Sequence, residues 1–175
     1  MTIVGDRAQR RSPAGTRTWA DMLDPYAPKR WVYRTLTVNY RTPGEIMDVA
    51  ARILAETDPT AVPPKSVRRT GIRPTVTETD ELSTAVAELV RAATPSTGSL
   101  AVIAPESVAL TVDHPVLTPA TAKGLEFDIV ILVEPATILR RSTYGAADLY
   151  VALTRATREL HIVHSRPLPT ALADR

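Results

Sequence analysis

The sequence predicts an α/β domain in which a mostly parallel sheet is covered by helices on both faces. Strand-like segments alternate with helical segments along the 175 residues. Two of the strand-like segments, "SLAVIAP" at 99–105 and "IVILV" at 129–133, are apolar throughout, as strands buried on both faces are. These observations favour a doubly wound fold, in which loops at the carboxyl ends of the strands carry the ligand site.

The composition fits one globular domain, with 44% hydrophobic and 23% charged residues. The net charge of +2 is too small to indicate nucleic-acid binding by itself. The absence of cysteine excludes disulfides and thiolate metal sites, and the histidines lack acidic partners at metal-site spacing, so no metal site is expected. Every apolar run is shorter than the roughly 18 residues of a membrane span. We therefore expect a cytoplasmic protein that does not contact a membrane.

The first elements follow from their end signals. "MTIVGD" at 1–6 has a strand pattern, and a helix is predicted within 18–26, with Thr18 as its N-cap and Pro25 as its stop. "RTLTVNY" at 34–40 is rich in β-formers and predicts a strand.

The segment 41–57 has the signals of a helix. Thr42 is the expected N-cap, Pro43 occupies the favoured first position, and Glu45 would complete a capping box with Thr42. Apolar residues then recur at helical spacing at Ile46, Val49, Ala50, Ile53 and Leu54.

The remaining elements are predicted from periodicity, and the tail after Pro167 is expected to be frayed. They are a loop at 58–74, a strand at 75–79, a helix at 80–94, a strand at 99–105, a weak strand before Thr118, a strong strand at 129–133, a helix at 145–159 and a strand at 160–165.

Three loops that follow strand patterns carry the candidate site residues. The loops Gly5–Arg10, Tyr40–Thr42 and Thr118–Glu126 are expected to converge at one edge of the sheet. Arg41 opens a helix whose N-terminus is already positive, which suggests an anion there, although a solvent-facing arginine fits its placement equally well.

Each of the other candidate residues also has an alternative interpretation without a functional role. Gly124 permits a tight turn, and Glu126 beside it is either a ribose ligand or a surface acid. Arg155, at the margin of the predicted helix 145–159, is either a phosphate ligand or a side chain that extends along the helix to solvent. Gln9 follows a strand and is either a phosphate sensor or an ordinary loop residue.

Four stretches occur in an order that is specific to one family. "VGDRAQ", "LTVNYRTPGEI", "TPATAKGLEFDIVIL" and "LYVALTRATREL" resemble motifs III, IV, V and VI of superfamily 1 helicases of the UvrD/Rep type. Within that group, "TWADML", "SVRRTGIRP" and "VEPATI" are most similar to the HelD/HelR type of helicase-like ATPase, which associates with RNA polymerase.

The resemblance implies a RecA-like second motor domain of the P-loop NTPase class. Residues 31–166 would form that domain, residues 1–30 would be a remnant of the first motor domain, and residues 167–175 would be a tail. By the same resemblance, this chain forms the arginine side of an ATP cleft. Gln9 would be the γ-phosphate sensor, Arg41 and Arg155 the catalytic arginines, and Glu126 the ribose ligand. Tyr40 and Gly124 would flank the nucleotide.

The sequence lacks the other side of that cleft. No G-x-x-x-x-G-K-[ST] stretch and no acidic magnesium-binding pair occur in it. ATP and its Mg²⁺ would therefore be held through a first motor domain, in cis or in trans, and we expect no ATP hydrolysis by this chain alone. RNA polymerase and DNA are the further partners that the resemblance implies.

Two alternatives remain open at this stage. The chain could be a catalytically inert interaction module that binds RNA polymerase or a partner motor domain, or it could be a decayed fragment. One departure from the family also affects the fold. Residues 106–115 form a connection too short for the helix that the family has there, so the sheet could be rearranged or incomplete at this point.

Overall fold

The structure is a computed structural model that describes residues 2–5, 18–57, 61–93, 98–141 and 144–173. Gln9 and the loop around it lie outside these ranges. Residues 2–5, which were expected to belong to a strand, have no regular secondary structure.

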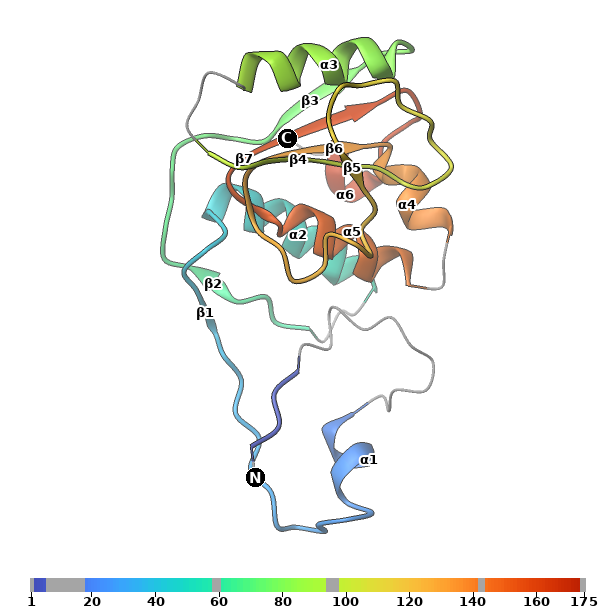
Figure 1. The fold of residues 1–175 in the computed structure, drawn as a ribbon. Helices are drawn as coiled ribbons and strands as arrows, with labels where there is room; N and C mark the ends of the chain where they lie inside the picture. The colour runs from blue at the N-terminus through green and yellow to red at the C-terminus, as the bar shows by residue number, and fades with distance from the viewer. Residues whose placement is uncertain (1, 6–17, 58–60, 94–97, 142–143, 174–175) are drawn as a thin grey trace.

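The described residues form a parallel five-stranded sheet in the order β3-β7-β6-β4-β5 and a separate parallel pair, β1-β2 (Figure 1). The strands are β1 (Val38–Asn39), β2 (Lys65–Ser66), β3 (Thr75–Glu78), β4 (Leu100–Ile103), β5 (Val116–Leu117), β6 (Phe127–Val133) and β7 (Ala156–His164). The predicted fold class, a mostly parallel α/β sheet of the RecA-like type, is confirmed.

Helices cover both faces of the sheet, with α3 on one face and α2, α4, α5 and α6 on the other (Figure 1). The helices are α1 (Trp19–Leu23), α2 (Gly44–Thr57), α3 (Leu82–Ala93), α4 (Pro135–Arg141), α5 (Gly145–Leu153) and α6 (Thr170–Ala173). The short helix α1 lies apart from the sheet, at the bottom of the view. No helix in the described ranges combines the length and the apolarity that crossing a membrane requires.

The central strand β6 shows why both faces must be covered. Val130 and Leu132 pack with α2 and α5, whereas Ile131 and Val133 pack with α3, and all four are fully buried. Because successive side chains of a strand point to opposite faces, an unbroken apolar run requires a core on each side.

The start of α1 agrees with its sequence signals, and the start of α2 does not. The Thr18 hydroxyl accepts a hydrogen bond from the Asp21 amide at 3.0 Å, and the Asp21 carboxylate accepts one from the Thr18 amide. The capping box predicted for Thr42 and Glu45 is wrong. Glu45 instead accepts hydrogen bonds from the amides of Thr70 and Gly71, because the turn at Gly71 directs these donors toward it.

The helix predicted for 145–159 is only half correct. It ends at Leu153, and residues 156–159 belong to β7. The Thr154 hydroxyl donates to the carbonyl of Tyr150 at 2.8 Å, which satisfies one of the last helical carbonyls. The helices α4 and α6 were not predicted. The described part of the tail, residues 168–173, is not frayed, because Ala171 and Leu172 of α6 are buried in the core.

The connection at 104–115 contains no helix, yet the sheet is complete beside it. Val102 of β4 pairs with Val116 of β5, so the expectation of an incomplete sheet is wrong. Burial alternates along the connection, and its inward apolar residues pack against the core under α3. These inward residues are Val108, Leu110 and Val112. An extended segment therefore covers the sheet where a helix was expected.

Glu134 joins the carboxyl ends of β6 and β7. It is 1% exposed and has a left-handed φ of 51°. Its Oε1 accepts hydrogen bonds from the Ser165 amide at 2.6 Å, the Ser165 hydroxyl at 2.8 Å and the Arg166 amide at 3.3 Å. Burial alone would raise the pKa of Glu134, but these hydrogen bonds and the charge of Arg166 lower it overall.

We expect Glu134→Gln to lower the free energy of unfolding at pH 7 by about 2 kcal/mol, because a neutral amide replaces a carboxylate that accepts three hydrogen bonds. The folded-state pKa lies below the unfolded one, so this stabilisation is complete above the unfolded pKa and is lost as the pH falls through the folded value. Urea unfolding from pH 7 to pH 3 measures both effects. The exposed Glu78→Gln is the control, and an acid-side slope unchanged by Glu134→Gln would contradict the prediction.

Candidate functional site

Asn39, the last residue of β1, shapes the loop that carries Arg41. Its Oδ1 accepts hydrogen bonds from the amides of Arg41 at 2.9 Å and Thr42 at 3.3 Å. Its Nδ2 donates to the carbonyl of Thr42 and to the hydroxyl of Ser66 on β2, both at 3.3 Å. The backbone of Arg41 is thus fixed while its side chain remains 73% exposed.

The Arg41 side chain extends from the start of α2 to the loop before β6. Its Nη1 contacts Oε1 of Glu126, whose side chain is 38% exposed. Gly124, with φ of 85°, makes the turn that brings Glu126 to this place, and a Cβ there would meet nothing within 4 Å. The contact joins residues that are 85 positions apart in the sequence.

Arg155 lies between α5 and β7 and is only 9% exposed. Its Nε donates to the carbonyl of Val151 at 3.0 Å, its Nη1 to the carbonyl of Leu125 at 3.0 Å and its Nη2 to the hydroxyl of Thr154 at 3.3 Å. The guanidinium thus binds one carbonyl near the C-terminal end of α5, that of Val151, where a positive charge is favourable. The alternative interpretation, in which the Arg155 side chain extends along the helix to solvent, is therefore wrong.

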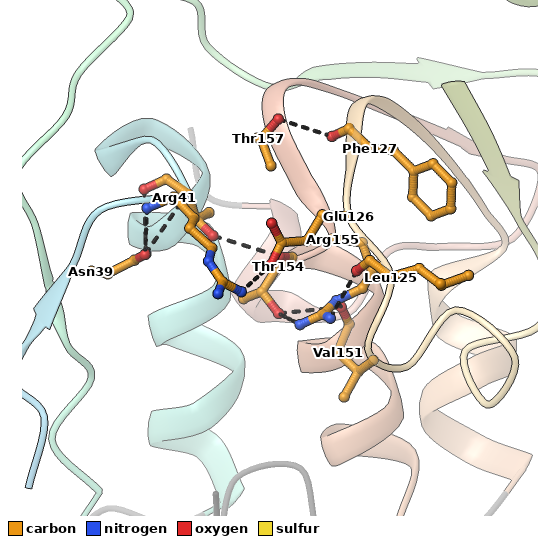
Figure 2. Close-up of polar contacts among 10 residues, drawn as sticks. Asn39, Arg41, Leu125, Glu126, Phe127, Val151, Thr154, Arg155 and Thr157 are labelled. Carbon is orange, nitrogen blue, oxygen red and sulfur yellow. Dashed lines mark hydrogen bonds and ion pairs between the residues drawn. The ribbon is translucent and has the colours of Figure 1, made fainter. Parts of the chain in front are cut away.

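The two arginines meet at one short segment. Arg41 contacts Glu126, and Arg155 donates to the neighbouring residue Leu125, so both side chains reach the same strand entry in Figure 2. The hydroxyl of Thr42 also donates to the carbonyl of Thr154 at 3.5 Å, which links the two arginine loops directly.

This site lies at the opposite edge of the sheet from the one expected. Glu126 and Arg155 immediately precede β6 and β7, so they are at the amino ends of these strands. The loops Tyr40–Thr42 and Thr118–Glu126 do converge, through the contact of Arg41 with Glu126. The placement differs because Leu125–Glu126 ends a crossover that has returned from the carboxyl end of β5.

The other predicted residues are placed less fully. Tyr40 precedes Arg41 in the sequence and is 72% exposed. Gly124 belongs to the turn before Glu126. Gln9 lies outside the described residues, so its proposed role stays a prediction.

Sequence reasoning missed three residues that organise this site. Asn39 was read only as part of a strand, although an Asn just before a helix start is a signal for a side chain that binds the amide two residues ahead. Thr154 and the backbone of Leu125, which hold the guanidinium of Arg155, carry no comparable signal. A carbonyl acts through its position, which the residue type does not reveal.

Comparison with protein families gives one match that covers more than half of the chain. The family described as the viral superfamily 1 RNA helicase core domain matches residues 61–164. These residues include all strands of the large sheet. A comparison with curated proteins found no match.

Two solved structures support the same fold. The C-terminal domain of a possible DNA helicase from Lactobacillus plantarum WCFS1 is 20% identical, with a TM-score of 0.54, and the match covers 77% of this chain and 92% of that one. The PRRSV helicase is 18% identical, with a TM-score of 0.50, and the match covers 80% of this chain and 25% of that one. The chain thus spans about a quarter of the length of the PRRSV helicase.

Proposed function

The chain belongs to the family of the viral superfamily 1 RNA helicase core domain, and from that membership we propose that it acts as the second motor domain of a helicase-like ATPase. It would supply the arginine side of an ATP cleft and would need a first motor domain for the phosphate loop. The observation that carries this proposal is the meeting of Arg41 and Arg155 at the segment Leu125–Glu126.

The two arginines differ in what they offer to a phosphate. Arg41 is exposed on a fixed backbone, so its side chain is able to reach phosphate oxygens at the domain surface. Arg155 is fixed by protein carbonyls and adds positive charge close to the same point. Bound ATP would supply the phosphoryl group that is transferred, and the chain would supply charge that stabilises its transfer.

Several finer assignments belong to the same proposal. Gln9 would sense the γ-phosphate, Tyr40 and Gly124 would flank the nucleotide, and Glu126 would contact the ribose. Residues 1–30 would come from the first motor domain, and residues 31–166 would form the second. Helix α6, beyond residue 166, packs on the core of this second domain.

We further propose that the whole motor is of the HelD/UvrD type and remodels RNA polymerase or a nucleic acid. The motif resemblance supports this assignment. The described residues in 61–93 and 98–126 also support it, because they form β2, β3, β4, β5, α3 and their connections, with no inserted accessory unit among them. Cytoplasmic location follows from such partners and stays part of the proposal.

The test is complementation in trans. Neither this chain nor a separately expressed first motor domain should hydrolyse ATP efficiently alone, whereas the mixture should. Arg41→Ala should lower the rate of the mixture by about 10²-fold, the loss typical of removing one charge-stabilising donor. Arg69→Ala is the matched control, because Arg69 is similarly exposed and pairs with Asp48. Equal rates for the two variants, or hydrolysis by this chain alone, would contradict the proposal.

A second candidate function is an inert interaction module that binds RNA polymerase or a partner motor domain. It is favoured by Arg155, because each of the three nitrogens of its guanidinium donates to a protein atom. A mixture that hydrolyses no ATP, together with retention of RNA polymerase on the immobilised chain, would support this candidate instead.

A further inference from the structure

We propose that Glu126 is a built-in competitor for the phosphate-binding arginine. In the chain without nucleotide its carboxylate occupies the guanidinium of Arg41, and a phosphate group must displace it. The proposal rests on the proposed function and adds regulation of the same site. It gives Glu126 a role in the chain without nucleotide, which precedes the ribose contact proposed for the bound state.

The pair of Arg41 and Glu126 is arranged for exchange. Both side chains reach solvent, with exposures of 73% and 38%, and neither is held by a core around it. The two backbones are fixed independently, by Asn39 on one side and by the turn at Gly124 on the other. Rotation of side chains is therefore enough to separate the charges, and the loops keep their places.

Arg155 is engaged differently from Arg41. Its guanidinium nitrogens donate to the carbonyls of Val151 and Leu125 and to the hydroxyl of Thr154. Figure 2 shows the dashed contact of Glu126 running to Arg41. The carboxylate thus occupies a donor of Arg41 that a phosphate oxygen would otherwise accept from.

Carboxylate and phosphate oxygens bind the same fork of guanidinium donors, so they exclude one another on Arg41. An exposed ion pair contributes little, so the competition is expected to weaken phosphate binding only a few-fold. The pair therefore lowers the affinity of Arg41 for phosphate ligands by this factor without blocking them.

Inorganic tripolyphosphate has no ribose, so its binding responds to the competition by Glu126 and not to a ribose contact. We would measure its binding and that of ATP to the whole purified chain by calorimetry at low ionic strength. If Glu126 competes, Glu126→Gln should tighten the binding of both ligands by about 2-fold to 5-fold. The gain should disappear in an Arg41→Ala background, since no guanidinium is then left to release.

Asp48→Asn is the matched control, because it removes one negative charge from an exposed pair with Arg69. An unchanged affinity for tripolyphosphate with a weaker one for ATP would identify Glu126 as a ribose ligand and overturn the proposal. An equal gain with Asp48→Asn would reduce the effect to net charge, and no binding by any variant would also overturn it. None of these measurements needs a first motor domain, so they stand apart from the complementation test.

Discussion

Arg155→Ala is expected to lower the free energy of unfolding by about 2 kcal/mol, because it removes a buried guanidinium that donates to two backbone carbonyls and one hydroxyl. The carbonyl of Val151 keeps a contact with the Thr154 hydroxyl, so the loss falls mainly on Leu125 and on the C-terminal end of α5. In the complemented motor, the same change should lower ATP hydrolysis by about 10³-fold or more if Arg155 acts as an arginine finger.

These two effects of Arg155→Ala must be separated. Urea unfolding of the chain measures the first, and hydrolysis assayed well below the unfolding transition measures the second. Arg158→Ala is the control, since Arg158 is three residues further along and forms a pair with Glu159 in which the side chains are 34% and 27% exposed. If Arg155→Ala and Arg158→Ala had equal free energies of unfolding, the guanidinium of Arg155 would not hold α5 to the segment before β6.

Gly145→Ala is expected to destabilise the chain by about 3 kcal/mol through overpacking of α4 against α5. A Cβ at Gly145 would lie 2.1 Å from the carbonyl oxygen of Leu139 and 2.8 Å from that of Ile138. Both are backbone atoms, so neither can rotate away and the two helices must separate. Denaturant unfolding monitored by circular dichroism measures the loss.

Gly71→Ala gives the contrasting case for Gly145. Its φ is 75°, and nothing lies within 4 Å of an added Cβ, so only backbone strain of about 1–2 kcal/mol is expected. If Gly145→Ala proved milder than Gly71→Ala, the close approach of α4 and α5 would be wrong.

The fold was predictable where the pattern of apolar residues is local. β6, α2 and α3 follow from unbroken or periodic apolar runs, and the capping box of Thr18 is set by neighbours in sequence. The end of α5 was not predictable in this way. Its residues after Leu153 still fit a helix, and they become a strand because β6 offers them a ladder. The box expected at Glu45 failed for a similar reason, since distant amides compete for its carboxylate.

The members of the site were found more readily than its geometry. Arg41, Glu126 and Arg155 were named from their sequence context, and the structure brings them together. Their placement at the amino ends of β6 and β7 could not be read from the chain, because it depends on where the crossover from β5 returns. The contact between Arg41 and Glu126 likewise joins residues that no local pattern connects.

The extended connection between β4 and β5 has a consequence for how this fold tolerates change. Its inward positions hold the sheet, while Ser107, Ala109, Thr111 and Asp113 alternate with them and are exposed. What this crossover must preserve is a row of apolar side chains at every second position, and a helix is only one way to deliver it. This connection should therefore tolerate the insertion of an additional folded unit at its exposed positions while the neighbouring strands keep their register.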